Sequence, residues 1–136
     1  MTSATAVHLP RTLVNQLLHL AQSSPEQEIC GLIGRRDEQC ECYPIDNVAT
    51  DASVLFALNA SEQIAAMKSM REQGQDLFAI YHSHPSAAAA PSVKDIEEAD
   101  YPDALYLIIS LNTKGVLEMR AFYLRDKQVK EVELSL

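Results

Sequence analysis

The sequence predicts an α/β (α+β) domain in which a mixed β-sheet is flanked by helices. Two segments have the apolar periodicity of helices, and they are interspersed among short apolar runs typical of strands. The length of 136 residues suits a single domain over 1–136, and the apolar fraction of 47% is that of an ordinary globular protein. We therefore expect the element order α-β-β-β-α-β-α-β-β-β around one core.

The first helix is predicted over Arg11 to Ala21, where apolar residues recur at helical spacing after Pro10. A short apolar run from Ile29 to Gly34 predicts a buried strand. The loosely alternating segment from Cys40 to Val48 is expected to pair with it. Val54 to Leu58 is a further strand candidate.

The second half of the chain begins with a helix predicted over Ser61 to Gln73, with Gly74 at its end. Leu77 to Tyr81 predicts an apolar strand, and Ser92 to Ala99 a short acidic helix. Three late strands are expected over Leu105 to Leu111, Val116 to Leu124 and Val129 to Leu134, the first two joined by a turn at Asn112 to Gly115.

Composition excludes several classes of partner. The net charge is −8 and no run of Lys or Arg occurs, so we expect neither nucleic acid nor a membrane surface as partner. No stretch has the roughly 18 apolar residues that a transmembrane helix needs. Three cysteines without a secretory signal predict a reducing, cytoplasmic location.

A histidine pair follows the strand predicted over Leu77 to Tyr81. His82 and His84 are separated by one residue, so on a strand they share one face with Cα atoms roughly 6.5 Å apart. Pro85 then ends the strand. The pair could be two surface histidines, or two imidazoles that converge on one metal ion.

An acidic residue returns after the next loop, in Ser92-Val93-Lys94-Asp95. Taken alone, this segment reads as a capping box, in which Ser92 and Asp95 satisfy free backbone N–H groups. Beside His82 and His84, Asp95 could instead be a third ligand of a mononuclear catalytic site. Such a set could also hold Fe(II). Those sites usually lie in a double-sheet barrel, so the intervening helices favour zinc.

Glu28 stands just before the apolar run from Cys30 to Gly34. A glutamate at the start of a strand is ordinarily just solvated. Together with His82-Ser83-His84-Pro85 and Ser92-Val93-Lys94-Asp95, however, it resembles the full signature of the JAMM (MPN-plus) metalloproteases, which is a Glu, then His-x-His-Pro, then Ser-x-x-Asp. The resemblance extends over most of the chain, from about residue 7 to 124.

The resemblance implies a JAMM/cytidine-deaminase-like sandwich with one Zn²⁺ per chain, held by His82, His84 and Asp95. It implies two catalytic residues, Glu28 as the general base that holds the attacking water and Ser92 as a donor to the oxyanion. Minimal bacterial members of this type are peptidases or isopeptidases acting after the C-terminal Gly-Gly tail of a ubiquitin-like or sulfur-carrier protein.

Two readings of function stay open at this stage. The first is a zinc-dependent hydrolase, and the alternative is a non-catalytic MPN-type binding module or scaffold with a structural metal. The carrier protein, the released group and the oligomeric state are not specified by the residues. Cys40 and Cys42 are expected to be buried or edge-strand thiols, Cys30 to lie in the core, and neither His8 nor His19 receives a function.

Overall fold

The computed structural model describes residues 6–112 and 117–135. Its helices are α1 (Arg11–Gln22), α2 (Ala60–Glu72) and α3 (Val93–Glu97). Its strands are β1 (Ala6–His8), β2 (Cys30–Arg36), β3 (Gln39–Ile45), β4 (Asp76–His84), β5 (Leu105–Ser110), β6 (Glu118–Arg125) and β7 (Gln128–Ser135).

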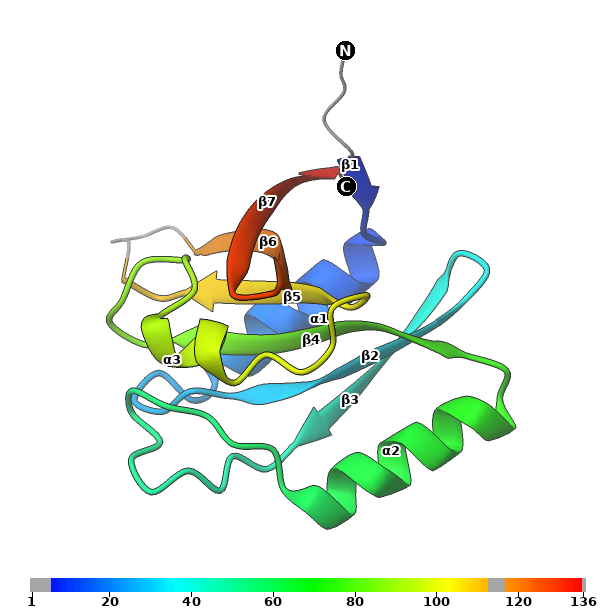
Figure 1. Cartoon of the computed structure of the whole chain (residues 1–136), viewed down its shortest axis with the longest axis horizontal. Coiled ribbons are helices and arrows are strands. Elements are labelled where there is room, and N and C mark those ends of the chain that lie inside the picture. Colours follow the sequence, from blue (N-terminus) through cyan, green and yellow to red (C-terminus); the bar gives the residue numbers. More distant parts are fainter. Residues whose placement is uncertain (1–5, 113–116, 136) are drawn as a thin grey trace.

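All of these strands belong to one curled, mixed sheet in the order β1-β7-β6-β5-β4-β2-β3 (Figure 1). β4 and β5 are parallel, as are β1 and β7, and the remaining neighbours are antiparallel. The predicted α+β class, a mixed sheet flanked by helices, is confirmed. Because β4 and β5 are parallel, their carboxyl ends meet at one edge of the sheet, where α/β folds commonly place ligands.

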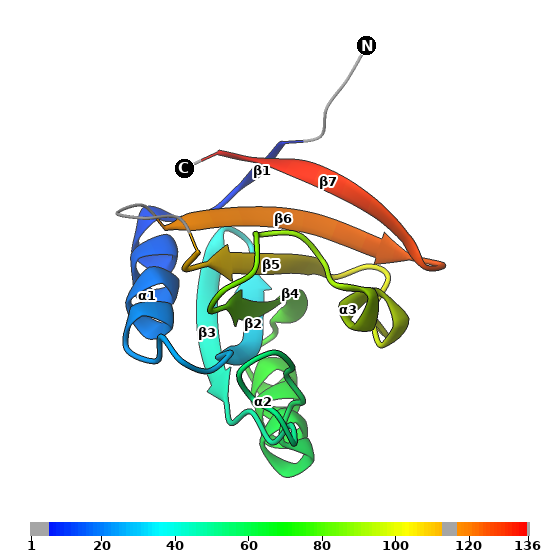
Figure 2. The ribbon, with the colours of Figure 1, turned by 90° about the vertical axis from the view of Figure 1, so that its left-hand side faces the viewer.

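The helices cover the two faces of the sheet unequally. α1 packs on one face through Leu13, Val14 and Leu17, while α2 and α3 lie on the other side of the sheet (Figure 2). Successive side chains of β4 alternate between the faces, so Tyr81 packs with α1 and Ile80 packs in the cluster of α2. Each face therefore has its own apolar cluster, and β4 contributes to both.

The structure corrects the strand predicted over Val54 to Leu58. This segment is part of a loop between β3 and α2, and only Leu58 forms an isolated bridge, to Asn47. Side chains compete here for the backbone: Asp51 Oδ1 accepts from Ser53 N at 3.2 Å, and Asn47 Oδ1 accepts from Ala57 N at 3.0 Å. Asx contacts of this kind favour turns over a strand ladder.

The order of elements differs from the prediction at the N-terminus as well. β1 is an additional strand of three residues, paired in parallel with β7 near the other end of the chain. The turn predicted at Asn112 to Gly115, and Val116 at the start of the predicted strand, fall largely outside the described residues. In the described part of the chain, no helix combines the length and apolar character needed to cross a membrane.

The cysteines lie where the sequence predicts them. Cys30 is buried in β2, while Cys40 and Cys42 are half-buried in the edge strand β3. All three are free thiols.

Candidate metal centre

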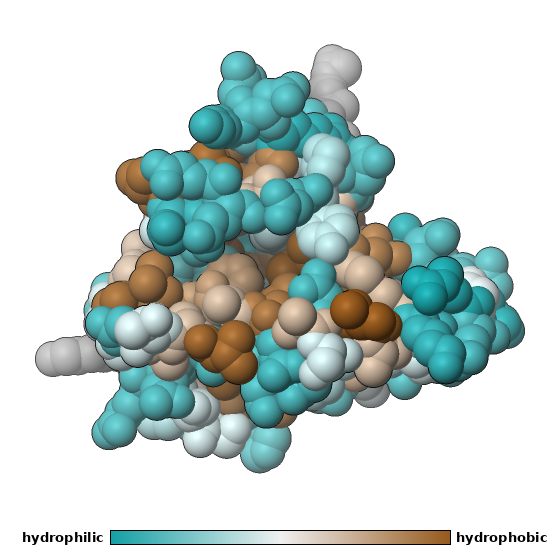
Figure 3. Space-filling model, turned by 60° about the horizontal axis from the view of Figure 1, so that its bottom comes forward, coloured by the Kyte–Doolittle hydropathy of each residue, from teal (hydrophilic) through white to brown (hydrophobic). Residues whose placement is uncertain are grey.

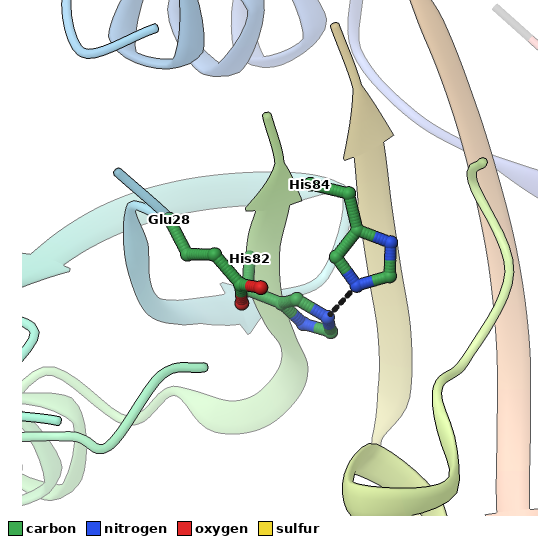
Figure 4. A group of neighbouring side chains, drawn as sticks. All are labelled: Glu28, His82 and His84. Carbon is green, nitrogen blue, oxygen red and sulfur yellow. Dashed lines mark hydrogen bonds between the residues drawn. The ribbon is translucent and has the colours of Figure 1, made fainter. Parts of the chain in front are cut away.

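The last residues of β4 bring two histidines together. His82 and His84 point to the face opposite α1, because the intervening Ser83 points the other way and accepts a hydrogen bond from Ile29 N at 2.9 Å. Both imidazoles are buried, and their Nε2 atoms lie 3.1 Å apart (Figure 4). The spacing of the histidines thus produces the convergence that the sequence allows.

Asp95 reaches the same point from α3. Its Oδ2 atom lies 3.1 Å from His82 Nε2 and 3.3 Å from His84 Nε2. The same Oδ2 accepts from Ser92 N at 2.9 Å, and Asp95 N donates to Ser92 Oγ at 3.0 Å. These two bonds form the capping box of α3. The two interpretations of Asp95 are therefore compatible, since one carboxylate caps the helix and faces both imidazoles.

Glu28 enters the cluster from the residues just before β2. It is 4% exposed, and one atom from each of Glu28, His82 and His84 lies within 4.8 Å of the others (Figure 4). Its Oε1 atom is buried and has no hydrogen-bond partner among the described residues. The backbone fixes its position, because Glu28 N donates to Ala52 O at 2.7 Å. A buried carboxylate without a partner is rare and costly.

The two imidazoles are oriented by different neighbours. His84 Nδ1 lies 2.8 Å from Ala88 O and donates to it, so the neutral ring has its lone pair on Nε2, which faces His82 and Asp95, and the protonated ring donates from Nε2 to Asp95. His82 has no such bond, since its Nδ1 is a buried atom without a partner in the described chain. Its ring instead stacks on Phe56, with centroids 4.3 Å apart and planes 19° from parallel.

The protonation states follow from burial and the close contacts. Burial raises the pKa of Glu28 to about 7, with His84 opposing the rise and Asp95 adding to it. Burial lowers the pKa of His82 more than Asp95 raises it. Burial also lowers the pKa of His84, but the hydrogen bonds of His84 with Asp95 and Ala88 raise that pKa by more, so the net shift is upward. Burial raises the pKa of Asp95 too, yet the bonds from both histidines hold that pKa well below its usual range.

The cluster fits a tetrahedral metal ion. Ligands bound to zinc at 2.0–2.2 Å in a tetrahedron are spaced about 3.3–3.6 Å apart. The three atoms His82 Nε2, His84 Nε2 and Asp95 Oδ2 are 3.1–3.3 Å apart, close to that spacing. Two imidazoles and one carboxylate are also a common donor set for catalytic zinc. Glu28 Oε1, which is buried beside them without a hydrogen-bond partner in the described chain, indicates that the site takes a further polar group.

A cavity of about 180 Å³ adjoins the cluster, and His82 and Asp95 form part of its wall. Figure 3 shows hydrophobic side chains gathered around a hollow on the underside of the molecule, with hydrophilic side chains at its edges. Besides His82 and Asp95, the cavity wall is mainly apolar and aromatic, with two further acidic residues: Phe56, Leu58, Ile80, Tyr101, Tyr106, Glu98 and Asp100. An apolar wall with a few polar groups is typical of a ligand site.

The structure brings together the predicted residues Glu28, His82, His84 and Asp95. Ser92 joins them through its backbone N–H, which donates to Asp95 Oδ2. Three further groups of this region were not predicted from the sequence: Phe56, Asn47 and the carbonyl of Ala88. A polar Asn directly after a strand is a turn signal that could have drawn attention to Asn47. No sequence signal marks the stacking of Phe56 on a histidine of a different element.

The fold and this cluster together define a hydrolase of the JAB-domain, or JAMM, type. The chain belongs to the family described as prokaryotic homologs of the JAB domain, whose model matches residues 10–124. The match includes every residue of the predicted signature.

Relatives and solved structures agree with this assignment. The chain is 33% identical over 93 residues to a desampylase of Haloferax volcanii, covering 66% of this chain and 67% of that protein. It is 32% identical over 123 residues to a protein of Thermus thermophilus named "Probable TtuB-protein conjugate cleaving protease", covering 90% of this chain and 78% of that protein. A protein of Desulfitobacterium hafniense has a similar structure, with a TM-score of 0.78, 31% identity and coverage of 96% and 92%. A JAB1/MPN domain protein of Archaeoglobus fulgidus shares the fold at a TM-score of 0.54 and 17% identity, with full coverage of both chains.

Proposed function

We propose that this protein is a zinc-dependent peptidase or isopeptidase. It hydrolyses the amide bond after the C-terminal Gly-Gly tail of a ubiquitin-like or sulfur-carrier protein. The observation that carries the proposal is the convergence of His82, His84 and Asp95 within 3.3 Å of one another, beside a buried Glu28 whose Oε1 has no partner. The relatives named as a desampylase and a conjugate-cleaving protease support the substrate class.

His82, His84 and Asp95 would hold the zinc ion, each through the atom that already faces the other two. Bound zinc supplies a Lewis acid that lowers the pKa of water and polarises a carbonyl group. Asp95 contributes the negative charge of the donor set, and the Ala88 carbonyl keeps His84 in the tautomer whose Nε2 can bind metal.

Glu28 is the group that moves protons. Its carboxylate takes a proton from the attacking water and passes it to the nitrogen of the leaving amine. No described neighbour competes for its Oε1 atom, and the bond from Glu28 N to Ala52 O fixes its backbone. Ser92 lies at the start of α3, where its hydroxyl would donate to the carbonyl oxygen of the substrate. The cysteines are free thiols, in keeping with a cytoplasmic enzyme.

The test is hydrolysis of a carrier conjugate by the zinc-loaded protein. A ubiquitin-like protein is joined through its C-terminal Gly-Gly to a fluorescent amine, and release of the amine is followed. We expect turnover by the wild type, and loss of both bound zinc and turnover in His84→Ala. His19→Ala serves as the matched control, because His19 is a histidine of α1 on the other side of the sheet.

Two outcomes would contradict the proposal. If His84→Ala binds as much zinc as the wild type, the ligand assignment is wrong. If the zinc-loaded wild type binds the carrier tail but never cleaves the conjugate, the protein is a binding module rather than a peptidase.

A further inference from the structure

The two histidines of the cluster differ in how their rings are restrained. A metal-binding histidine almost always donates its second N–H to a neighbouring acceptor, which fixes the ring. His84 follows this rule through Ala88 O at 2.8 Å. His82 does not, because its Nδ1 is buried and has no partner among the described residues. Something other than a hydrogen bond must therefore hold the more deeply buried imidazole in place.

The contact that can do so is the ring of Phe56. It lies nearly parallel to the His82 imidazole, at 19°, with a centroid distance of 4.3 Å. Rotation of the imidazole about its Cβ–Cγ bond would drive a ring edge into the face of Phe56. The stack therefore limits the direction in which His82 Nε2 can point, namely toward His84 Nε2 and Asp95 Oδ2 at 3.1 Å each.

Phe56 is itself held firmly, although it belongs to a loop. The side-chain amide of Asn47 donates to Leu55 O at 2.9 Å and accepts from Ala57 N at 3.0 Å, which fixes the backbone on both sides of Phe56. The same amide donates to Glu28 O at 2.9 Å. One side chain thus ties the loop that presents Phe56 to the backbone of Glu28.

We propose that Phe56 is a positioning residue that holds the His82 imidazole in its metal-binding orientation, in place of the missing hydrogen bond, with Asn47 anchoring it. This inference rests on the proposed assignment of His82 as a zinc ligand. It gives the loop between β3 and α2 a defined part in the site. Without the stack, His82 would populate other ring orientations, and zinc binding would have to select the competent one.

The experiment compares two identical substitutions on opposite faces of the sheet. Phe56→Leu keeps an apolar side chain but removes the stack. Phe78→Leu is the matched control, because Phe78 is a partly buried aromatic of β4 that packs on the α1 face, with the Arg35 guanidinium 4.0 Å from its ring centroid. Phe56→Tyr restores an aromatic ring. Zinc affinity is measured by competition with a chromophoric chelator, and the ligand field by the visible absorption of the Co²⁺-substituted proteins.

We expect Phe56→Leu to bind zinc roughly tenfold more weakly than the wild type and to change the cobalt spectrum. Phe78→Leu should leave both readouts unchanged even if it lowers the melting temperature, and Phe56→Tyr should restore both. If Phe56→Leu does not fold, Phe56→Met replaces it, since methionine fills a similar volume without a ring. Wild-type zinc affinity and an unchanged cobalt spectrum in a folded Phe56→Leu or Phe56→Met variant would overturn the inference.

The outcomes separate this inference from the proposed function. A wild type that fails to bind zinc, or that loses none in His84→Ala, overturns the ligand assignment and this inference with it. A wild type that binds zinc at these residues but hydrolyses no conjugate overturns only the proposed function. In that case the effect of Phe56 on zinc affinity is still expected.

Discussion

At the scale of single residues, the cluster contains two buried atoms without hydrogen-bond partners in the described chain, Glu28 Oε1 and His82 Nδ1. Leaving a buried polar group unpaired costs about 1–3 kcal/mol. A glutamate with only a structural role would be selected against at such a position, or would be paired. The unpaired Oε1 close to two imidazoles therefore favours a chemical role for Glu28 over a role in folding.

Glu28→Gln tests that role directly. Glutamine has nearly the same shape but cannot accept a proton from water, so we expect turnover to fall by about 100- to 10,000-fold while zinc content and melting temperature change little. Steady-state hydrolysis of the carrier conjugate and metal analysis provide the measurements. Glu26→Gln is the matched control, since Glu26 is an exposed glutamate two residues earlier. A Glu28→Gln enzyme close to the wild-type rate would remove Glu28 from the mechanism.

The sequence predicts the residues of the site better than their environment. The i, i+2 spacing of His82 and His84 was enough to place both imidazoles on one face of β4, because strand geometry alone determines this. The contacts that orient the rings, from Phe56 and from the carbonyl of Ala88, were not predicted. They depend on how separate loops pack around the end of β4, and no local pattern encodes that.

At the scale of elements, the pairing of β2 with β4 positions Glu28 beside His82. Cys30 lies opposite His82 and Gly31 opposite Tyr81 in this antiparallel pair. The fully buried Tyr81 ring covers Gly31 so closely that an added Cβ would lie 2.3 Å from the hydroxyl oxygen and 2.4 Å from Cζ. Gly31 is therefore required for the two strands to approach at the point where the site is built.

Gly31→Ala should destabilise the protein by about 1–3 kcal/mol, because the rigid, enclosed Tyr81 ring cannot move away from the new methyl group. Thermal or urea unfolding measures the loss. Gly34→Ala in the same strand is the matched control. Its Cβ would lie 2.4 Å from Gln75 Oε1 and 3.0 Å from Met70 Cγ, but both atoms belong to flexible, unbranched side chains that can shift, so we expect a smaller loss. Equal losses in the two variants would contradict this account of the β2–β4 contact.

Ser92, at the start of the short helix α3, has two proposed roles, as a helix cap and as a hydrogen-bond donor to the substrate, and one substitution separates them. Glycine caps a helix nearly as well as serine, at a cost of a few tenths of a kcal/mol, so Ser92→Gly should melt close to the wild type. If the Ser92 hydroxyl also donates to the substrate oxygen, kcat should fall by about 100- to 1,000-fold with little change in KM.

Asn59→Gly is the control for Ser92→Gly. Asn59 caps α2 by accepting from Glu62 N at 2.9 Å, and it has no proposed part in catalysis. Normal kcat in Ser92→Gly would leave the capping box as the only role of this serine.

Most elements were predictable because their signals are local. The apolar periodicity of α1 and the glycine at the end of α2, with Gly74 at φ 69°, needed no tertiary information. β1 was missed because its three residues become a strand only by pairing with β7 at the far end of the chain. The segment from Val54 to Leu58 is apolar for another reason, since Phe56 and Leu58 line the cavity beside the site rather than a strand.

At the scale of the whole molecule, the apolar cluster beneath α1 and the metal centre lie on opposite faces of the sheet. The cluster beneath α1 includes Leu9, Leu17 and Leu107, which are fully buried. The proposed zinc ligands lie on the other side of the sheet, at the carboxyl end of β4 and the start of α3. A domain of this length buries roughly two-thirds of the surface of its unfolded chain. We therefore expect the core to hold the fold without a metal.

Removal of zinc should consequently abolish hydrolysis without unfolding the protein. Incubation with a chelator is expected to leave the far-UV circular dichroism spectrum and a cooperative thermal transition in place. The melting temperature should fall, because an ion that binds only the folded state stabilises it by RT ln(1 + [L]/Kd). Restoring zinc should return the activity and the original melting temperature.

Alkylation with iodoacetamide under native conditions is the control, since burial raises the pKa of Cys30 to about 12 and also raises the pKa values of Cys40 and Cys42. Neutral thiols react slowly, so alkylation should not reproduce the effect of the chelator. A chelated protein that loses its cooperative transition would identify the metal as structural and favour a binding module or scaffold. A chelated protein that stays folded and regains activity with zinc would identify the metal as the catalytic group.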